Sequence, residues 1–154
     1  MHPIPGARVS CPYGHKGSLW SGGRHRGVDF AAPAGTAVLV PWGGVVIGLG
    51  TWGPAYGSRS PVIDFDRLSA ARPGLWGVLA HLEVCYVRPG ERIAMGQPIG
   101  LVGSRGNATG PHLHFEVQAS AYWSAWQYHR DRDPSPWLHA GPSSAQPLWG
   151  GNGP

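Results

Sequence analysis

Residues 111–117 of the chain read PHLHFEV, a stretch in which polar and apolar side chains alternate. Successive side chains of a β-strand point to opposite faces, so the alternation predicts a strand with Leu113, Phe115 and Val117 facing a core. The opposite face would carry His112, His114 and Glu116. The two imidazoles would stand about 6.5 Å apart along the strand, close enough for one to hold a metal ion while the other acts beside it.

Seven further short runs have the β-branched or alternating character of strands and are bounded by Gly, Pro, Asn or Asp. They are residues 28–30, 37–40, 44–49, 61–65, 75–79, 91–94 and 98–102. The 25 glycines and 16 prolines of the 154-residue chain suit tight turns between strands and fit poorly in helix interiors. The sequence therefore predicts an all-β fold, an antiparallel sheet or sandwich with long loops, and argues against helical bundles and coiled coils.

The length of the chain leaves room for one domain, which we expect to span residues 1–138. Within it we expect an irregular lead-in over residues 1–24 and a long hairpin loop over residues 66–74. Residues 120–132 are expected to form an aromatic segment that is irregular or briefly helical. Residues 139–154 are rich in Gly, Pro, Ser, Ala and Gln, which predicts a flexible tail or linker.

The charge of the chain indicates which kinds of partner it can attract. The formal net charge is +4, and Lys16 is the only lysine. A basic protein attracts polyanions such as nucleic acids, anionic cell-wall polymers and membrane surfaces. The basic residues stand singly and no RNA-binding motif accompanies them, so we expect no nucleic-acid partner. No apolar stretch approaches the ~20 residues of a membrane span, and the opening residues, MHPIPG, lack the features of a signal peptide.

The two cysteines, Cys11 and Cys85, are too few for a disulfide framework and do not form a CxxC pair. We expect two small residues, buried or half-buried. A single bridge between them is the alternative.

A second group of polar residues lies in the stretch GGRHRGVDF, residues 22–30, where His25 and Asp29 are four positions apart. The glycines disfavour a helix, and on a straight strand the two residues would be about 13 Å apart, so joint ligation requires a bend, for which Gly27 is suited. Catalytic zinc takes three protein ligands and leaves a fourth position for water. Such a set is available in His25, Asp29 and one of His112 and His114, and His81 is a further candidate.

Each of these elements alone has an ordinary explanation. An HxxxD spacing often arises by chance, an isolated HxH on a strand is commonly a pair of exposed polar residues, and His81 could be a hydrogen-bonded, partly buried histidine. The specificity comes from their combination and their order along the chain.

In that order the chain resembles the lysostaphin-type, or LytM-like, zinc metallopeptidases, which cut the peptides of peptidoglycan. The residues that carry the resemblance are HRGVDFAAPAGT at 25–36, AHL at 80–82, Gly90 and the GQPIG turn at 96–100, and GNATGPHLHFE at 106–116. The resemblance covers residues 20–118 approximately. It implies a groove on an antiparallel sheet, one zinc ion per chain held by His25, Asp29 and His114, and a catalytic pair formed by His112 and His81. The loop at 66–74 and the aromatic segment after Val117 depart from the family pattern and bear on substrate preference.

The residue types suggest how such a site would work. Zinc would acidify a bound water and polarise the scissile carbonyl. His112 is suited to accept the proton of the water, because an unperturbed imidazole titrates near neutral pH. His81 would position or stabilise the oxyanion, or deliver a proton to the leaving amine, and both roles stay open. Glu116 would orient a ligand imidazole, or would simply pair with an arginine or solvent.

The sequence therefore predicts a zinc endopeptidase that hydrolyses peptide crosslinks of bacterial peptidoglycan, acting as a monomer. A relative that binds the wall or regulates another hydrolase without catalysis is the alternative, although every motif position is filled. A lipoyl or biotinyl carrier domain is disfavoured because the only lysine, Lys16, lies in the irregular lead-in. Without a signal peptide, we expect a phage-type lysin that reaches the wall through lysis or on the virion. The residues leave open whether a glycine bridge or a D-Ala crosslink is cut.

Overall fold

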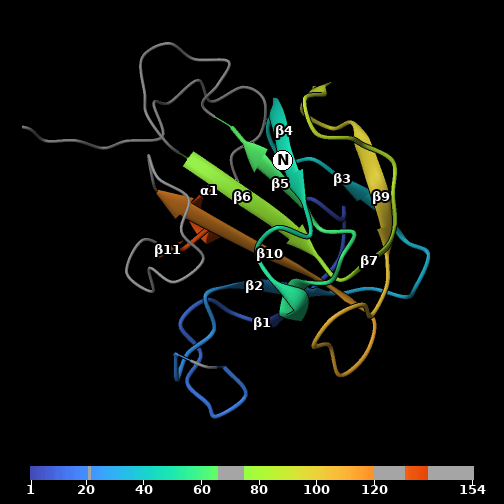
Figure 1. Ribbon diagram of the computed structural model, residues 1–154. Helices are drawn as coiled ribbons and strands as arrows, with labels where there is room; N and C mark the ends of the chain where they lie inside the picture. Colours follow the sequence, from blue (N-terminus) through green and yellow to red (C-terminus); the bar gives the residue numbers. More distant parts are fainter. Residues whose placement is uncertain (21, 66–74, 120–130, 139–154) are drawn as a thin grey trace, which may run out of the picture.

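The computed structural model describes residues 1–20, 22–65, 75–119 and 131–138 (Figure 1). Three predicted features lie outside the described residues: the hairpin loop at 66–74, most of the aromatic segment at 120–132, and the tail at 139–154. The described part is almost entirely β-structure, and its sheets are antiparallel, as the sequence predicts.

A large antiparallel sheet has the strand order β1-β2-β10-β6-β5-β4-β8, and β11 pairs with β10 beyond the end of β2. Its strands are β1 (Val9–Cys11), β2 (Gly27–Ala31), β4 (Gly44–Leu49), β5 (Pro61–Asp64), β6 (Leu75–Ala80), β8 (Arg92–Ile93), β10 (His112–Ala119) and β11 (Asp131–Arg132). The alternating residues 112–117 belong to β10, which runs through the middle of the sheet between β2 and β6 (Figure 1).

A smaller sheet has the order β3-β9-β7, with β3 (Ala37–Leu39), β9 (Pro98–Val102) and β7 (Leu82–Cys85). Its buried side chains pack against one face of the large sheet in a single apolar cluster. From the large sheet that cluster includes Leu113, Phe115 and Val117, so the predicted core face of β10 is confirmed. The other face of β10 is thereby free for the polar residues.

That other face of the large sheet is divided into an apolar and a polar half. Trp52, Val62, Val78 and Ala80 form a second buried cluster, whose sheet members come from β5 and β6. Tyr56, at the end of the 3-10 turn η1 (Pro54–Tyr56), packs against it. The polar half lies on β2 and β10, next to this cluster, because His114 pairs with Ala80 and Glu116 with Val78 across β10 and β6.

The chain passes from the large sheet to the small one at His81, between β6 and β7. Among the described residues His81 is the one non-glycine residue with positive φ, at 65°. A side chain makes this conformation costly, and such residues gather at functional sites. The backbone N–H of His81 donates to the carbonyl of Tyr56 at 2.9 Å, which ties the corner to η1.

All eight predicted runs contain a strand, but β1, β7, β11 and the short helix α1 (Ser135–Leu138) are not predicted from the sequence. The expectation of a wholly irregular lead-in is wrong, because Val9–Cys11 pairs with β2. A three-residue strand has too little periodicity to be detected, and it forms here because β2 offers a free edge. No helix in the described part of the chain is long and apolar enough to span a membrane.

Candidate metal centre and active-site cleft

Strand register brings the predicted site residues of β2 and β10 together. Asp29 on β2 is directly opposite His114 on β10, and such partners point to the same face. His112 is two positions along β10, opposite Ala31. His25 precedes β2 and is held by backbone hydrogen bonds to Gly14 and His15, which return the lead-in segment alongside it.

Three donor atoms converge to form a compact triangle. Nε2 of His25 lies 3.1 Å from Oδ1 of Asp29, and Nδ1 of His114 lies 2.8 Å from the same oxygen. The two ring nitrogens are 3.0 Å apart. Ligands about 2.0 to 2.1 Å from a tetrahedral zinc ion are about 3.3 Å apart, so two imidazoles and one carboxylate at these separations fit a zinc ion.

His25 and Asp29 meet, as the predicted bend between them requires, and Gly27 has a further role that the sequence does not predict. Its φ is not in the left-handed region, and its importance lies in close packing against β10. A Cβ at this position would meet the carbonyl oxygen of Phe115 and would lie 2.7 Å from Cε1 of His114. Glycine therefore makes room for the His114 ring.

Each of the two imidazoles is oriented through its other nitrogen. Nδ1 of His25 faces the carbonyl of Pro12 at 3.1 Å, and Nε2 of His114 faces Oε2 of Glu116 at 3.3 Å. A ring that donates N–H to these acceptors presents a lone pair on the nitrogen that faces Asp29. Metal-binding histidines commonly have such outer partners.

The electrostatics of this cluster favour a positive charge. Burial alone would raise the pKa of Asp29, but hydrogen bonds from His114 and His25 hold it well below its ordinary value. Burial would likewise lower the pKa of His114, yet hydrogen bonds to Asp29 and Glu116 raise it to about 9. The His114 ring lies between the two carboxylates, and its nitrogen facing Asp29 is thus a place where a proton or a metal cation is favoured.

The predicted catalytic histidines lie next to the triangle. The ring centroids of His81 and His112 are 4.6 Å apart, and Nε2 of His112 is 3.8 Å from Oδ1 of Asp29. Nδ1 of His81 is 2.7 Å from the carbonyl of Arg105, and Nδ1 of His112 is 2.8 Å from that of Gly110. Burial lowers the pKa of His81 to about 4, which keeps it neutral at pH 7.

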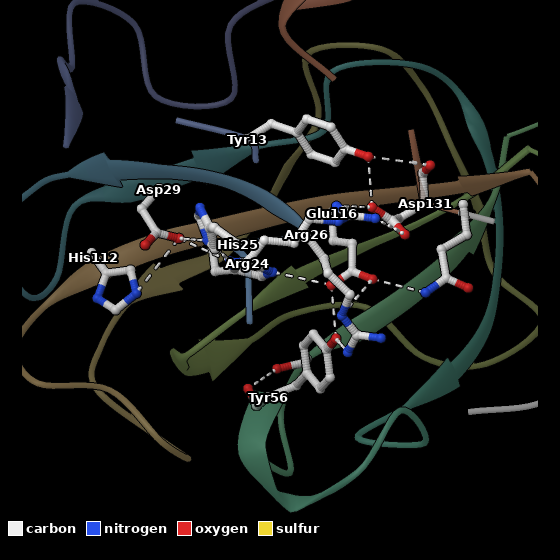
Figure 2. Close-up of polar contacts among 12 residues, drawn as sticks. Tyr13, Arg24, His25, Arg26, Asp29, Tyr56, His112, Glu116 and Asp131 are labelled. Atoms are coloured by element: carbon white, nitrogen blue, oxygen red, sulfur yellow. Dashed lines mark hydrogen bonds and ion pairs between the residues drawn. The ribbon is translucent and has the colours of Figure 1, made fainter. Parts of the chain in front are cut away.

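Glu116 belongs to a buried network that reaches beyond the predicted residues (Figure 2). The hydroxyl of Tyr56 donates to Oε2 of Glu116 at 2.7 Å and accepts from Nη2 of Arg26 at 2.7 Å. The amide of Gln118 donates to Oε1 of Glu116 at 2.8 Å. Burial would raise the pKa of Glu116, but His114 above all, with Arg26 and Gln118, lowers it to about 2. The sequence leaves two roles open for Glu116, orienting a ligand imidazole or pairing with an arginine or solvent. The network of this carboxylate contains both an imidazole and an arginine.

Tyr56 and Arg26 are not among the residues singled out from the sequence. Arg26 lies inside the HRGVD stretch, so its place beside a candidate ligand can be read from the sequence. Its pairing with Tyr56 cannot. Tyr56 lies in a Gly- and Pro-rich segment without periodicity, and nothing local to it indicates a role at the site.

A second network fastens the lead-in segment near the site (Figure 2). Arg24 makes two hydrogen bonds to the carboxylate of Asp131, at 2.6 and 3.0 Å, and the hydroxyl of Tyr13 donates to the same group at 2.7 Å. Asp131 is on β11, and its side chain is 1% exposed. This contact holds the neighbour of His25 against the far end of β10.

The four histidines line one cleft of about 330 Å³. Its walls come from three segments: Leu19 and Trp20 of the lead-in, Ala55 and Tyr56 of η1, and Asn107 and Thr109 of the loop before β10. The ring of Trp20 lies 5.2 Å from that of His25. A groove on an antiparallel sheet, flanked by loops, is the arrangement that the resemblance implies.

The two cysteines are both free and half-buried, in keeping with the primary expectation and not with a bridge. Cys11 lies opposite Asp29 on β1, whereas Cys85 is on β7 of the smaller sheet. Burial raises the pKa of each thiol above its ordinary value.

An antiparallel sheet that presents a His, His, Asp donor set beside two further imidazoles is an arrangement suited to a metal-dependent hydrolase. Comparison with known families supports that class: the model of peptidase family M23 matches residues 23–125. The match covers well over half of the chain, and the chain therefore belongs to peptidase family M23. The resemblance recognised from the sequence is confirmed.

Individual relatives agree with this assignment. The chain is 38% identical over 93 residues to the peptidoglycan DD-endopeptidase ShyA of Vibrio cholerae, which covers 60% of this chain and 20% of the relative. It is 31% identical over 118 residues to lysostaphin of Staphylococcus simulans, with coverage of 77% and 22%. It is 31% identical over 118 residues to the glycyl-glycine endopeptidase ALE-1 of Staphylococcus capitis, with coverage of 77% and 30%. The matches thus span only between about a fifth and a third of the length of these relatives.

Solved structures confirm the fold. The catalytic domain of lysostaphin from Staphylococcus simulans superposes with a TM-score of 0.75 at 28% identity, over 89% of this chain and 96% of that domain. A zinc-containing peptidase from Vibrio cholerae superposes with a TM-score of 0.68 at 27% identity, over 91% of this chain and 39% of the other.

Proposed function

We propose that the chain is a zinc-dependent endopeptidase that hydrolyses peptide crosslinks of bacterial peptidoglycan. The observation that carries the proposal is the triangle of His25, Asp29 and His114 with His81 and His112 beside it in one cleft. Membership of family M23 and the peptidoglycan endopeptidase activity of relatives such as ShyA support the substrate class.

In this proposal His25, Asp29 and His114 hold the metal. Zinc, when bound, supplies Lewis acidity toward the scissile carbonyl and its attacking water. The chain itself orients the two imidazoles through Pro12 and Glu116, so that the nitrogens facing Asp29 would exchange a proton for the ion. The ligand atoms are thus arranged before the ion binds, which lowers the free-energy cost of binding it.

His112 is the proposed general base. With its Nδ1–H donated to Gly110, Nε2 is the nitrogen that faces the site and can accept a proton from the attacking water. Hydrolysis then adds the oxygen of the water to the carbonyl carbon, breaks the C–N bond and returns the proton to the departing amine.

His81 is the proposed partner of His112 in this transfer. Its Nδ1–H is donated to the carbonyl of Arg105, so in the neutral ring Nε2 is an acceptor and becomes a donor only after taking up a proton. This arrangement favours proton delivery to the leaving amine over stabilisation of an oxyanion by a permanently protonated ring.

The proposed enzyme is a monomer of one domain over residues 1–138, with a tail or linker from residue 139. We propose that it is a phage-type lysin that reaches the wall at lysis or on the virion. The basic net charge suits an encounter with the anionic polymers of the wall.

The test is mass spectrometry of peptides released from purified sacculi by the zinc-loaded protein, with sacculi of the glycine-bridged and the directly crosslinked type. We expect new amino and carboxyl ends from one type, and none from the His114→Ala variant. Intact sacculi of both types that nevertheless sediment with the protein would instead support the alternative of a non-catalytic wall-binding relative.

A further inference from the structure

Cys11 lies in register with the metal centre. On β1 it is directly opposite Asp29, which is itself directly opposite His114 on β10. Three side chains of types that can bind a metal therefore form one row across three adjacent strands, since directly opposed residues share a face. The row begins at the edge of the sheet, because β1 pairs only with β2 in the described part of the chain.

The thiol is within reach of the ligand atoms. Sγ of Cys11, a ring nitrogen of His25 and a carboxylate oxygen of Asp29 all lie within 4.8 Å of one another. His25 and Asp29 also belong to the triangle with His114, so two donor sets share these two residues. An ion held by His25 and Asp29 would therefore lie near the thiol of Cys11.

The local structure couples the cysteine to the ligand set. The carbonyl of Pro12, the next residue, orients the ring of His25 at 3.1 Å. Among the residues that the structure describes, the thiol has only a weak contact, 3.9 Å to that carbonyl, and forms no disulfide. Its residue is half-buried on a three-residue edge strand.

We propose that Cys11 is a fourth ligand of the metal centre, which closes the coordination sphere in a resting form of the protein. The inference rests on the metal-binding part of the proposed function. Ligation replaces the S–H bond by an S–metal bond: the thiol proton passes to solvent, and the water in the fourth position leaves. Closed four-ligand sets are typical of structural zinc sites, whereas catalytic sites keep one position open, so substrate must displace the thiolate before turnover.

A thiolate also changes which ions the centre prefers. Cysteine favours soft and borderline ions such as zinc, cobalt and cadmium, and it disfavours magnesium and calcium. The chain would therefore retain cadmium more tightly than a set of two imidazoles and one carboxylate would.

The experiment is absorption spectroscopy of the protein loaded with one equivalent of Co²⁺. We expect a near-ultraviolet band from thiolate-to-cobalt charge transfer in the wild type and in Cys85→Ser, and its loss in Cys11→Ser. All three proteins should bind one ion and show visible cobalt bands. Wild-type protein that binds one Co²⁺ and cleaves sacculi without the charge-transfer band would overturn the role of Cys11 and leave the proposed function intact. Wild-type protein that binds no Co²⁺ would overturn both.

Thiol labelling provides a second measurement that needs no variant. Maleimide should label Cys11 in the chelator-treated protein and leave it protected after Zn²⁺ is added, while labelling of Cys85 is the same in both states, as peptide mass spectrometry would record. Equal labelling of Cys11 with and without Zn²⁺, in protein that has taken up one ion, would contradict the proposal.

Discussion

The ring of His114 packs directly against the backbone of Gly27, so that a Cβ there would lie 2.7 Å from Cε1 of the ring. Side chains do not approach this closely, and the same Cβ would collide with the carbonyl of Phe115. The glycine of the HRGVD stretch is thus tied to the position of a proposed metal ligand on another strand.

Gly27→Ala should displace the His114 ring or separate β2 from β10. We expect a loss of about 1 to 3 kcal/mol in the free energy of unfolding, as for other overpacked sites, together with loss of bound zinc. Urea denaturation and metal analysis would measure the two effects. Gly110→Ala is the matched control for fold and metal content, since a Cβ there meets nothing within 4 Å and φ is not left-handed. Unchanged zinc content in Gly27→Ala would contradict the prediction.

His112→Ala and Asp29→Ala should separate catalysis from metal binding. His112 is outside the donor triangle, so its variant should keep one zinc ion and lose about 10²- to 10⁴-fold in hydrolysis rate. Asp29 touches both imidazoles, so its variant should lose the metal as well. Metal analysis and the rate of peptide release would be measured on the same samples. Full activity of His112→Ala, or loss of its zinc, would refute the assignment of His112.

Tyr56→Phe should weaken metal binding from a distance. The variant removes the hydroxyl that connects Arg26 to Glu116, and Glu116 in turn orients the His114 ring. Loss of such an outer partner costs about 10- to 100-fold in metal affinity or activity. Competition with a chromophoric chelator would measure the affinity. Tyr86→Phe, at a tyrosine that is 53% exposed, is the control and should bind zinc like the wild type. An equal affinity in all three proteins would show that Glu116 needs no support from Tyr56.

Asp131→Ala should destabilise the lead-in segment. The buried carboxylate accepts from Arg24 and Tyr13, and removal of one partner of such a network costs about 1 to 3 kcal/mol. Glu83→Ala is the control, because its pair with Arg105 has a similar distance of 2.7 Å but is exposed. Exposed pairs contribute about 0 to 1 kcal/mol. The urea midpoint of Asp131→Ala should therefore lie well below that of Glu83→Ala. Equal midpoints would refute the stabilising role of the buried pair.

Tyr13 should make stability depend on alkaline pH. Burial, together with the hydrogen bond to Asp131 and its charge, raises the pKa of the Tyr13 phenol above the ordinary value of about 10. The folded protein therefore holds this proton more tightly than the unfolded chain, and the associated stability is present below about pH 10 and declines as the pH rises through the folded pKa. Denaturation at several pH values should show a shallower alkaline decline in Tyr13→Phe than in the wild type. Identical slopes would contradict the prediction. Tyr56 is present in both proteins and therefore contributes equally to their alkaline slopes.

The β-class and the faces of β10 follow from local patterns in the sequence. The candidate site residues follow from the family that the order of the motifs along the chain indicates. Alternation with period two assigns Leu113 and Phe115 to the core and His112 and His114 to the other face, and the order of the motifs identifies the family. The eight predicted runs all contain strands because turn residues and β-branched residues act within a few positions of one another.

How these residues meet depends on the three-dimensional fold. Asp29 and His114 are 85 positions apart and become neighbours through strand register, which no local pattern specifies. The same holds for the support of Glu116 by Tyr56, for the pair of Arg24 and Asp131, and for the place of Cys11 beside Asp29. Such contacts depend on which strands pair and on close packing between them, as the absent side chain of Gly27 demonstrates. Long-range register thus determines the geometry of the site, whereas short-range periodicity determines which residues are available to build it.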